Sequence, residues 1–210
     1  EETSEIFTDE EQDTAKEASE DISVFSPEDV PAFSDETENV LAAAQGEGNR
    51  EIDLSNNYNV DHNGIRSIDY GGTYNFTSNN QVTQNRIVIH NIDSTQDKVE
   101  IHLNNLNIRT SKGPALYIMD SVDVDVFIYL QGNNKLITTN SSSAGLQKDN
   151  LAKLTIDNAP NYSGSVTVTS DYGYGAVIGG GLNASGTNIY ILGGSVTATS
   201  TFGAGIGGGP

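Results

Sequence analysis

The sequence predicts an all-β fold: a right-handed parallel β-helix of about five turns, with a repeat of roughly thirty residues. Three observations predict this fold. Mostly apolar residues recur at this interval in two columns. Segments in which apolar and polar residues alternate lie between Asn- and Gly-containing segments, where the alternation stops. A fixed period of this length is typical of stacked turns rather than of a single globular core. The two columns are Leu106, Leu136, Val166 and Val196, and Ile108, Thr138, Val168 and Ala198.

Period-two alternation identifies the strands of each turn. In residues 122–130 (VDVDVFIYL), alternate residues are aliphatic, which predicts a strand with one buried face. We therefore expect three strands in every turn. The first is at 101–103, 128–130, 154–156 and 189–191, the second at 106–108, 136–138, 166–168 and 196–198, and the third at 114–118, 144–148, 175–179 and 203–207.

Residues at the turns and in the third strands complete the pattern. Asn- and Gly-containing segments at 104–105, 132–134, 161–164 and 193–194 separate first from second strands, and both residue types tolerate positive φ. A third apolar column is expected at Leu116, Leu146, Val177 and Ile206. An earlier, looser turn is predicted with residues 71–78 as its second strand and 86–90 as its third.

The N-terminal segment differs sharply from the rest. Residues 1–50 contain sixteen acidic residues against two basic ones, a net charge of −14, whereas residues 51–210 have thirteen against eight, a net of −5. Such a segment buries too little apolar surface to offset the entropy of ordering. We expect a disordered acidic leader or spacer at 1–50 and the β-helix domain at 51–210. The start at EETSE suggests a removed signal peptide, and the end at Pro210 suggests truncation of the stack.

Composition excludes several classes of function. The formal net charge is −19 and the basic residues are scattered, which argues against binding nucleic acid or anionic lipid. There is no Cys, so disulfides, thiol catalysis and zinc–thiolate sites are excluded. No apolar run is long enough to span a membrane. We expect a monomeric extracellular or cell-surface bacterial protein.

Outward-facing aromatic residues are the first candidate site. We expect His102, Tyr129, Thr155 and Tyr190 to stack in one column, with Glu100, Phe127, Lys153 and Asn188 in the column beside it. Aromatic rings pack against the C–H face of sugars while polar neighbours bind the hydroxyls. Aromatic residues are also common on solvated sheet faces without any ligand. The candidate carbohydrate-binding residues are His102, Tyr117, Phe127, Tyr129, Lys153 and Tyr190.

Carboxylates are the second candidate site. Calcium takes six to eight oxygen ligands, which Asp side chains and carbonyls of adjacent turns can supply. A solvated acidic face is the alternative, since no EF-hand-type loop is present. The candidate calcium ligands are Asp93, Asp97, Asp120, Asp123, Asp125 and Asp149.

Two further patterns are considered. Thr167 and Thr169 are expected above Thr197 and Thr199, with Thr139 and Arg109 continuing the ladder; so short an array is weak support for ice binding. The Gly-rich segments lack the Lys-Ser/Thr of a phosphate-binding loop and fit tight packing of the turns.

The stretch from 71 to 170 also resembles a family of clostridial-type secreted carbohydrate-binding domains. The residues that carry the resemblance are DKVEIHLNNL (97–106), SKGPALYI (111–118) and LQKDNLAKLTI (146–156). The resemblance implies a pectate-lyase-like β-helix that binds plant-wall polysaccharides, including acidic ones, and can carry calcium. The Gly-rich turns after 170 are more similar to those of large surface adhesins.

These observations lead to three hypotheses for the function. The first is a non-catalytic carbohydrate-binding β-helix, possibly calcium-dependent, with a polysaccharide or glycan as partner. The alternative is a structural stalk or adhesin repeat. A polysaccharide lyase is a further alternative, for which Lys112, Lys148 and Lys153 are the bases nearest the acids.

Overall fold

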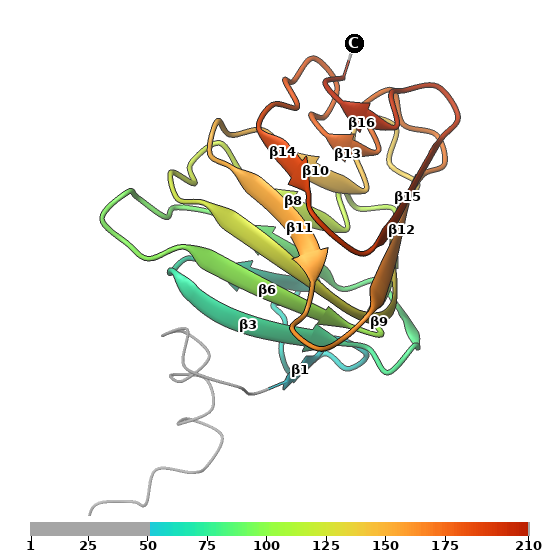
Figure 1. Cartoon of the computed structure of the whole chain (residues 1–210). Helices are drawn as coiled ribbons and strands as arrows, with labels where there is room; N and C mark the ends of the chain where they lie inside the picture. The colour runs from blue at the N-terminus through green and yellow to red at the C-terminus, as the bar shows by residue number, and fades with distance from the viewer. Residues whose placement is uncertain (1–50, 210) are drawn as a thin grey trace, which may run out of the picture. The chain divides into compact units, whose positions relative to one another are not determined.

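The computed structural model describes residues 51–209, which form an all-β parallel solenoid of about six turns with a repeat near 28 residues (Figure 1). The predicted fold class is therefore confirmed. The acidic segment 1–50 lies outside the described residues. In the part that is described, no helix is long and apolar enough to cross a membrane.

Every turn after the first contributes strands to three sheets, and the first contributes to sheets 1 and 3 only; the sheets are numbered in the order in which the chain passes through them. Sheet 1 has the order β1 (Glu51–Asp53), β3 (Gly72–Thr77), β6 (Val99–Asn104), the first part of β9 (Val126–Thr138), β11 (Leu154–Asn158) and β14 (Ile189–Ile191). Sheet 2 contains β4 (Val82–Thr83), β7 (Asn107–Thr110), the second part of β9, β12 (Gly164–Ser170) and β15 (Ser195–Ser200). Sheet 3 has the order β2 (Ile65–Ile68), β5 (Arg86–Ile89), β8 (Leu116–Ile118), β10 (Leu146–Lys148), β13 (Ile178–Gly179) and β16 (Ile206–Gly207).

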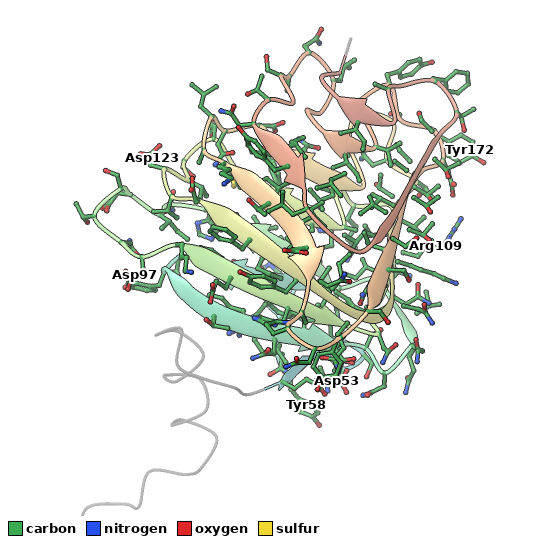
Figure 2. All side chains as sticks on the ribbon, in the orientation of Figure 1. Asp53, Tyr58, Asp97, Arg109, Asp123 and Tyr172 are labelled. Atoms are coloured by element: carbon green, nitrogen blue, oxygen red, sulfur yellow. The ribbon has the colours of Figure 1, made fainter. Side chains whose placement is uncertain are left out.

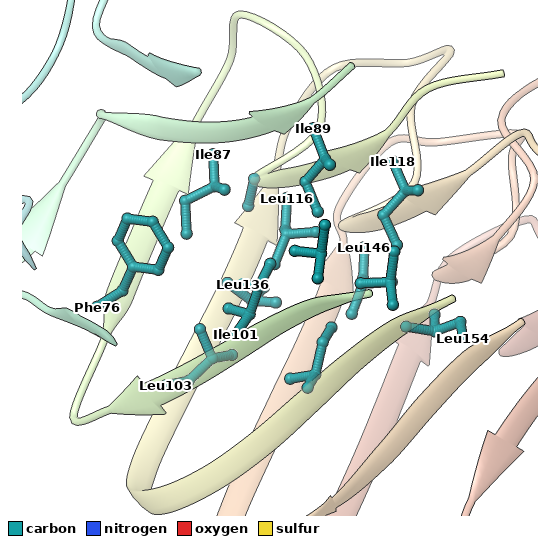
Figure 3. Close-up of a cluster of buried hydrophobic side chains, with 14 of the residues drawn as sticks. Phe76, Ile87, Ile89, Ile101, Leu103, Leu116, Ile118, Leu136, Leu146 and Leu154 are labelled. Atoms are coloured by element: carbon teal, nitrogen blue, oxygen red, sulfur yellow. The ribbon is translucent and has the colours of Figure 1, made fainter. Parts of the chain in front are cut away.

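The core is the space enclosed by the three sheets. Side chains at alternate positions point inward from facing strands, such as Ile101 and Leu103 of β6 and Ile87 and Ile89 of β5 (Figure 3). All four are fully buried. This confirms the inward and outward faces that the alternation predicts.

The register between turns differs from the prediction in sheet 2. Leu136 pairs with Ile108 and Val168, so it does not stand level with Leu106 and Val166. Asn134 takes that level: it pairs with Val166 and its Oδ1 accepts a hydrogen bond of 2.9 Å from the amide of Leu106. The predicted column through Ile108 and Thr138 is shifted in the same way. Thr138 pairs instead with hydroxyl residues of the adjacent turns, in the column Thr110, Thr138, Ser170 and Ser200.

Two other assignments were wrong. Residues 72–77 belong to sheet 1, the first strand of their turn, and the short β4 supplies the second strand instead. In sheet 3, Leu146 pairs with Ile178 rather than Val177, although both are buried. Val177 and Ile178 are adjacent, both aliphatic and both buried, so hydrophobicity alone does not select which of them pairs with Leu146.

A predicted break also proves to be a bend within one strand. The segment 132–134 was expected to separate two strands, yet β9 runs without interruption through both sheets. Gly132 sits at the bend with φ of 65°, a left-handed conformation that favours glycine. A Cβ at this position would lie 2.3 Å from the side-chain oxygen of Asn105 in the turn below. The strand therefore changes sheets at its glycine.

Candidate functional site

Five of the six predicted carbohydrate-binding residues lie on or beside the outer face of sheet 1. His102 is on β6, Phe127 and Tyr129 are on β9, and Tyr190 is on β14, all at outward positions of the alternation. Lys153 immediately precedes β11. The sheet thus gathers residues that are 88 positions apart in sequence, from 102 to 190, onto one surface.

The columns on this surface differ from those expected. Thr155 pairs with Phe127 and Tyr190, not with Tyr129. The first column is Thr73, Glu100, Phe127, Thr155 and Tyr190, and the second is Asn75, His102, Tyr129 and Asp157. The correction is a two-residue shift of β11 against β9, which keeps every side chain on its predicted face.

Three aromatic rings lie next to one another on this surface. Phe127 and Tyr129 have centroids 6.3 Å apart and ring planes 12° from parallel, and the His102 ring lies 4.9 Å from Tyr129 with its plane tilted by 36°. These three residues are half-buried, whereas Tyr190 is 47% exposed. Because the half-buried rings are already packed, a ligand that covers them would not need to order them first.

Two lysines border the rings. The Nζ of Lys98 lies 5.1 Å from the centroid of Phe127, and the Nζ of Lys153 lies 4.9 Å from that of Tyr190. Such cation–π contacts are worth about 0.5–1 kcal/mol at exposed sites. Lys98 also pairs with Glu100 at 2.8 Å. The lysines therefore place positively charged groups beside the rings.

Glu100 and His102 have shifted pKa values. The pKa of Glu100 is lowered by its hydrogen bond from Lys98, with a smaller lowering from Thr73, although partial burial opposes both. The hydroxyl of Thr73 donates to Glu100 at 3.0 Å. Burial lowers the pKa of His102, while Glu100 raises it. At neutral pH the surface therefore presents a charged carboxylate and a neutral imidazole, which can accept and donate hydrogen bonds.

Sequence reasoning missed two polar neighbours of the rings: Lys98 and Thr73. Each stands two residues from a selected position or pairs with one across strands, so the alternation would have revealed them. Thr155, between Phe127 and Tyr190, is 3% exposed, and its hydroxyl oxygen has no hydrogen-bond partner among the described residues.

Tyr117 does not belong to this surface. It lies on β8 in sheet 3, where its hydroxyl donates a hydrogen bond of 2.9 Å to Asp149. Asp149 also accepts hydrogen bonds from the Gln147 side chain and the Gly181 amide, at 2.7 and 3.2 Å. These contacts join three turns of the solenoid.

The remaining candidate calcium ligands lie in two stacked loops. Asp93 and Asp97 are between β5 and β6, and the other three, Asp120, Asp123 and Asp125, are between β8 and β9. Ile92 and Val122 form a bridge that holds the loops together. Asp97 and Asp123 lie on the side where the strands of sheet 1 begin (Figure 2). Within 51–209, no three His, Asp or Glu side chains come together in a group that could hold a metal ion.

Some of these carboxylates already bind local groups. Asp93 accepts hydrogen bonds from the amide and hydroxyl of Thr95, which lower its pKa. Asp125 accepts one of 3.2 Å from the amide of Lys153. Calcium binding here would require these side chains to rearrange, and it stays a prediction.

A second polar surface lies on sheet 2. A hollow of about 360 Å³ is lined by Asn80, Asn107, Asn133, Asn134, Lys135, Ser165 and Thr167. The predicted pairs Thr167 with Thr197 and Thr169 with Thr199 are confirmed. Arg109 pairs with Ile137, which in turn pairs with Thr169, so Thr139 does not belong to the ladder.

The lysines considered for a lyase are occupied in different ways. Lys148 is 1% exposed and its Nζ donates to the carbonyl of Asn150 at 2.8 Å. Lys112 donates to the carbonyl of Asn63 at 3.3 Å. Lys153 faces Tyr190, so the three do not share one site.

No protein-family model matches the chain, and no curated protein or solved structure is significantly similar to it. The β-helix that the sequence resemblance implies is present, while the family itself is not identified by these comparisons.

Proposed function

We propose that the protein is a non-catalytic carbohydrate-binding β-helix whose ligand lies across the outer face of sheet 1. The observation that supports this most is the nearly parallel pair Phe127 and Tyr129, with centroids 6.3 Å apart, beside the tilted ring of His102 at 4.9 Å from Tyr129. A pyranose has a C–H face of matching shape, and burial of that face against rings is favourable.

Polar groups beside the rings would bind the hydroxyls of the sugar. Lys98 and Lys153 supply N–H donors, and Glu100 supplies a carboxylate held in place by Lys98 and Thr73. Charge-assisted hydrogen bonds of this kind are stronger than those between neutral groups. The rings would thus supply most of the buried area, and the charged groups would orient the ligand.

The parallel register favours a polymer over a single sugar. In the first column Glu100, Phe127 and Tyr190 are accessible, whereas Thr155, between the last two, is only 3% exposed. The strands of a sheet are about 4.8 Å apart, so the three accessible side chains span four strands. A chain of sugars that crosses the strands would therefore contact several turns. The resemblance to secreted carbohydrate-binding domains agrees with this proposal.

A binding panel tests the function. Calorimetry or affinity electrophoresis against pectic, cellulosic and host glycans should show binding to at least one polysaccharide by wild-type protein. The Tyr129→Ala variant should bind it about tenfold less tightly, which corresponds to about 1.4 kcal/mol. Absence of binding to every polysaccharide in the panel would overturn the proposal.

Calcium dependence is a separate proposal on the loops that carry Asp93, Asp97, Asp120, Asp123 and Asp125. A cation that binds the folded state raises the melting temperature with its concentration. We expect calcium to raise it, EDTA to reverse the rise, and Asp97→Asn with Asp123→Asn to abolish it. An unchanged melting temperature would leave carbohydrate binding without a role for calcium.

A structural stalk is the second candidate function, and the stacking of the turns favours it. Four inward residues, Ile156, Ile178, Val166 and Val168, are buried and pair with residues of the next turn. One apolar core therefore joins the turns into a single unit. If the glycan panel is negative, force spectroscopy that shows unfolding of the whole solenoid as one resistant unit would support the stalk.

A further inference from the structure

Three exposed aromatic side chains gather at the corner between sheets 2 and 3 in the last two turns. Tyr172, Tyr174 and Phe202 are 64%, 52% and 64% exposed. Tyr174 and Phe202 stack across the turns, with centroids 5.6 Å apart and planes 21° from parallel. Tyr172 lies on the same side of the molecule as Arg109 (Figure 2). This group is separate from the rings of sheet 1 and was not among the candidates from sequence.

Earlier turns carry polar residues at the same corner. The register that aligns Thr110, Thr138, Ser170 and Ser200 continues one residue further, because the amide of Thr139 donates to Thr110 and that of Asp171 donates to Thr138. The next position along each corner is then Lys112, Asn140, Tyr172 and Phe202. At this position two earlier turns therefore carry a lysine and an asparagine, and the last two turns carry rings.

The corners hold these rings on a fixed backbone. The amides of Phe202 and Gly203 both donate to the hydroxyl of Ser200, at 3.2 and 2.8 Å. The hydroxyl of Thr201 donates to the carbonyl of Asp171 at 2.9 Å, which joins the two corners. A Cβ on Gly203 would lie 1.9 Å from the carbonyl oxygen of Gly175, so the corner fits glycine only. A ligand would meet preorganised rings and would not have to order a loop.

The chemistry around the rings suits a neutral sugar. Neither Tyr172 nor Tyr174 has a hydrogen-bond partner for its hydroxyl in the described part of the chain. Beside them, Arg109 and Asp171 neutralise each other in an ion pair of 2.9 Å. Exposed ring faces, free hydroxyls and no excess charge match a pyranose without a carboxylate, whereas sheet 1 places lysines and carboxylates around its rings.

We infer that Tyr172, Tyr174 and Phe202 form a second carbohydrate-binding platform, specific for neutral sugar units. The inference rests on the proposed function and adds a second site to it. Two sites on one rigid solenoid bind a polymer more tightly than either site alone, because the second contact becomes intramolecular. A short oligosaccharide, in contrast, would occupy the two sites independently.

Calorimetry and NMR with neutral hexasaccharides of glucose, xylose and mannose, and with their soluble polymers, test the inference. The variants are Tyr172→Ala with Phe202→Ala for the corner, Tyr129→Ala for sheet 1, and Tyr162→Ala as the control. Tyr162 is also an exposed turn tyrosine, 55% exposed, and its ring contacts no other ring or lysine within residues 51–209. All four substituted residues keep their backbone hydrogen bonds, and melting temperatures identify any variant that is misfolded.

For wild type we expect two molecules of a hexasaccharide per protein, and one for the corner variant. The corner variant should also lose about tenfold or more in affinity for the polymer, while Tyr162→Ala changes neither value. If the corner variant equals wild type while Tyr129→Ala loses binding, the inference is wrong and the proposed function stands. If only the corner variant loses binding, the second platform stands and sheet 1 does not bind neutral sugars. If wild type binds no neutral sugar, the inference is wrong, and binding of an acidic polysaccharide by the same protein leaves the proposed function standing.

Discussion

The hydroxyl of Tyr117 donates a hydrogen bond of 2.9 Å to the carboxylate of Asp149, which lies one turn further along the solenoid. The first residue was selected from sequence as a sugar ligand and the second as a calcium ligand. In the structure they bind each other, and Asp149 also accepts from Gln147 and Gly181. We conclude that this pair joins the turns of sheet 3.

Asp149→Ala should therefore destabilise the fold by about 1–3 kcal/mol, because it leaves partly buried donors without an acceptor. Urea unfolding followed by circular dichroism measures the change. Asp97→Ala, measured like Asp149→Ala in buffer with EDTA, is the matched control, since Asp97 is exposed on its loop and should change stability by less than about 0.5 kcal/mol. Equal effects of the two substitutions would show that the hydrogen bonds of Asp149 contribute nothing.

Stability should fall at alkaline pH because of a buried tyrosine. Burial, with a smaller contribution from Asp69, raises the pKa of Tyr74 from 10 to about 12. A raised folded-state pKa gives stability that is complete below pH 10 and is lost as pH rises through 12. Urea unfolding at pH 9 to 12 should show a smaller loss for Tyr74→Phe than for wild type. Parallel curves would contradict the assignment.

Asn134 tests the register of sheet 2. It is 1% exposed, accepts from the Leu106 amide, and donates to the carbonyls of Gln131 and Ser165 at 3.1 and 3.0 Å. Asn134→Leu adds apolar volume at an inward position but leaves these backbone groups without partners. We expect it to cost at least about 2 kcal/mol in urea unfolding.

Asn133→Leu is the matched control for this substitution, because Asn133 is the adjacent residue and is exposed. Its cost should stay below about 0.5 kcal/mol. If instead Asn134→Leu stabilised the protein, the apolar column Leu106, Leu136, Val166 predicted from sequence would be the correct one.

Lys148 gives a pH dependence of the opposite sign to that of Tyr74. Burial lowers the pKa of its ammonium group, although Asp149 raises it. Because the pKa is lowered in the folded state, the folded protein releases this proton at a lower pH than the unfolded protein does. The unfolding free energy therefore rises as the pH increases from the folded-state pKa to the unfolded value of 10.5. The unfolding free energy of wild type, minus that of Lys148→Met, should therefore increase from pH 7 to pH 10.5. A constant or decreasing difference would show that Lys148 is solvated.

Sequence predicted which side chains point inward and which outward, but not the neighbours they meet. Val126, Ile128 and Leu130 are buried and Phe127 and Tyr129 face out, as the alternation of β9 requires. The pairing of Thr155 with Phe127 rather than Tyr129 was not predictable, because a two-residue shift preserves the alternation. Turn length and backbone geometry decide between such registers, and the hydrophobic pattern of a single sequence does not predict either of them.

Polar residues inside the stack were missed for a related reason. Asn134 and Lys148 occupy inward positions where the period predicts aliphatic residues. Each is accommodated because backbone groups of its own or an adjacent turn bind it. Exposed corner aromatics such as Tyr172 were missed because period-two alternation applies only within strands, and the corners lie outside them. A search for large residues at turn positions would have found them.

The rings of sheet 1 are the centre of the proposed carbohydrate site, and one comparison of affinities tests whether they bind the ligand. The dissociation constant of the tightest polysaccharide in the panel is measured for wild type, Tyr129→Ala and Tyr162→Ala under identical conditions. We expect Tyr129→Ala to bind about tenfold more weakly, with Tyr162→Ala unchanged and both variants folded. Wild-type affinity in Tyr129→Ala would contradict the claim that this surface binds carbohydrate.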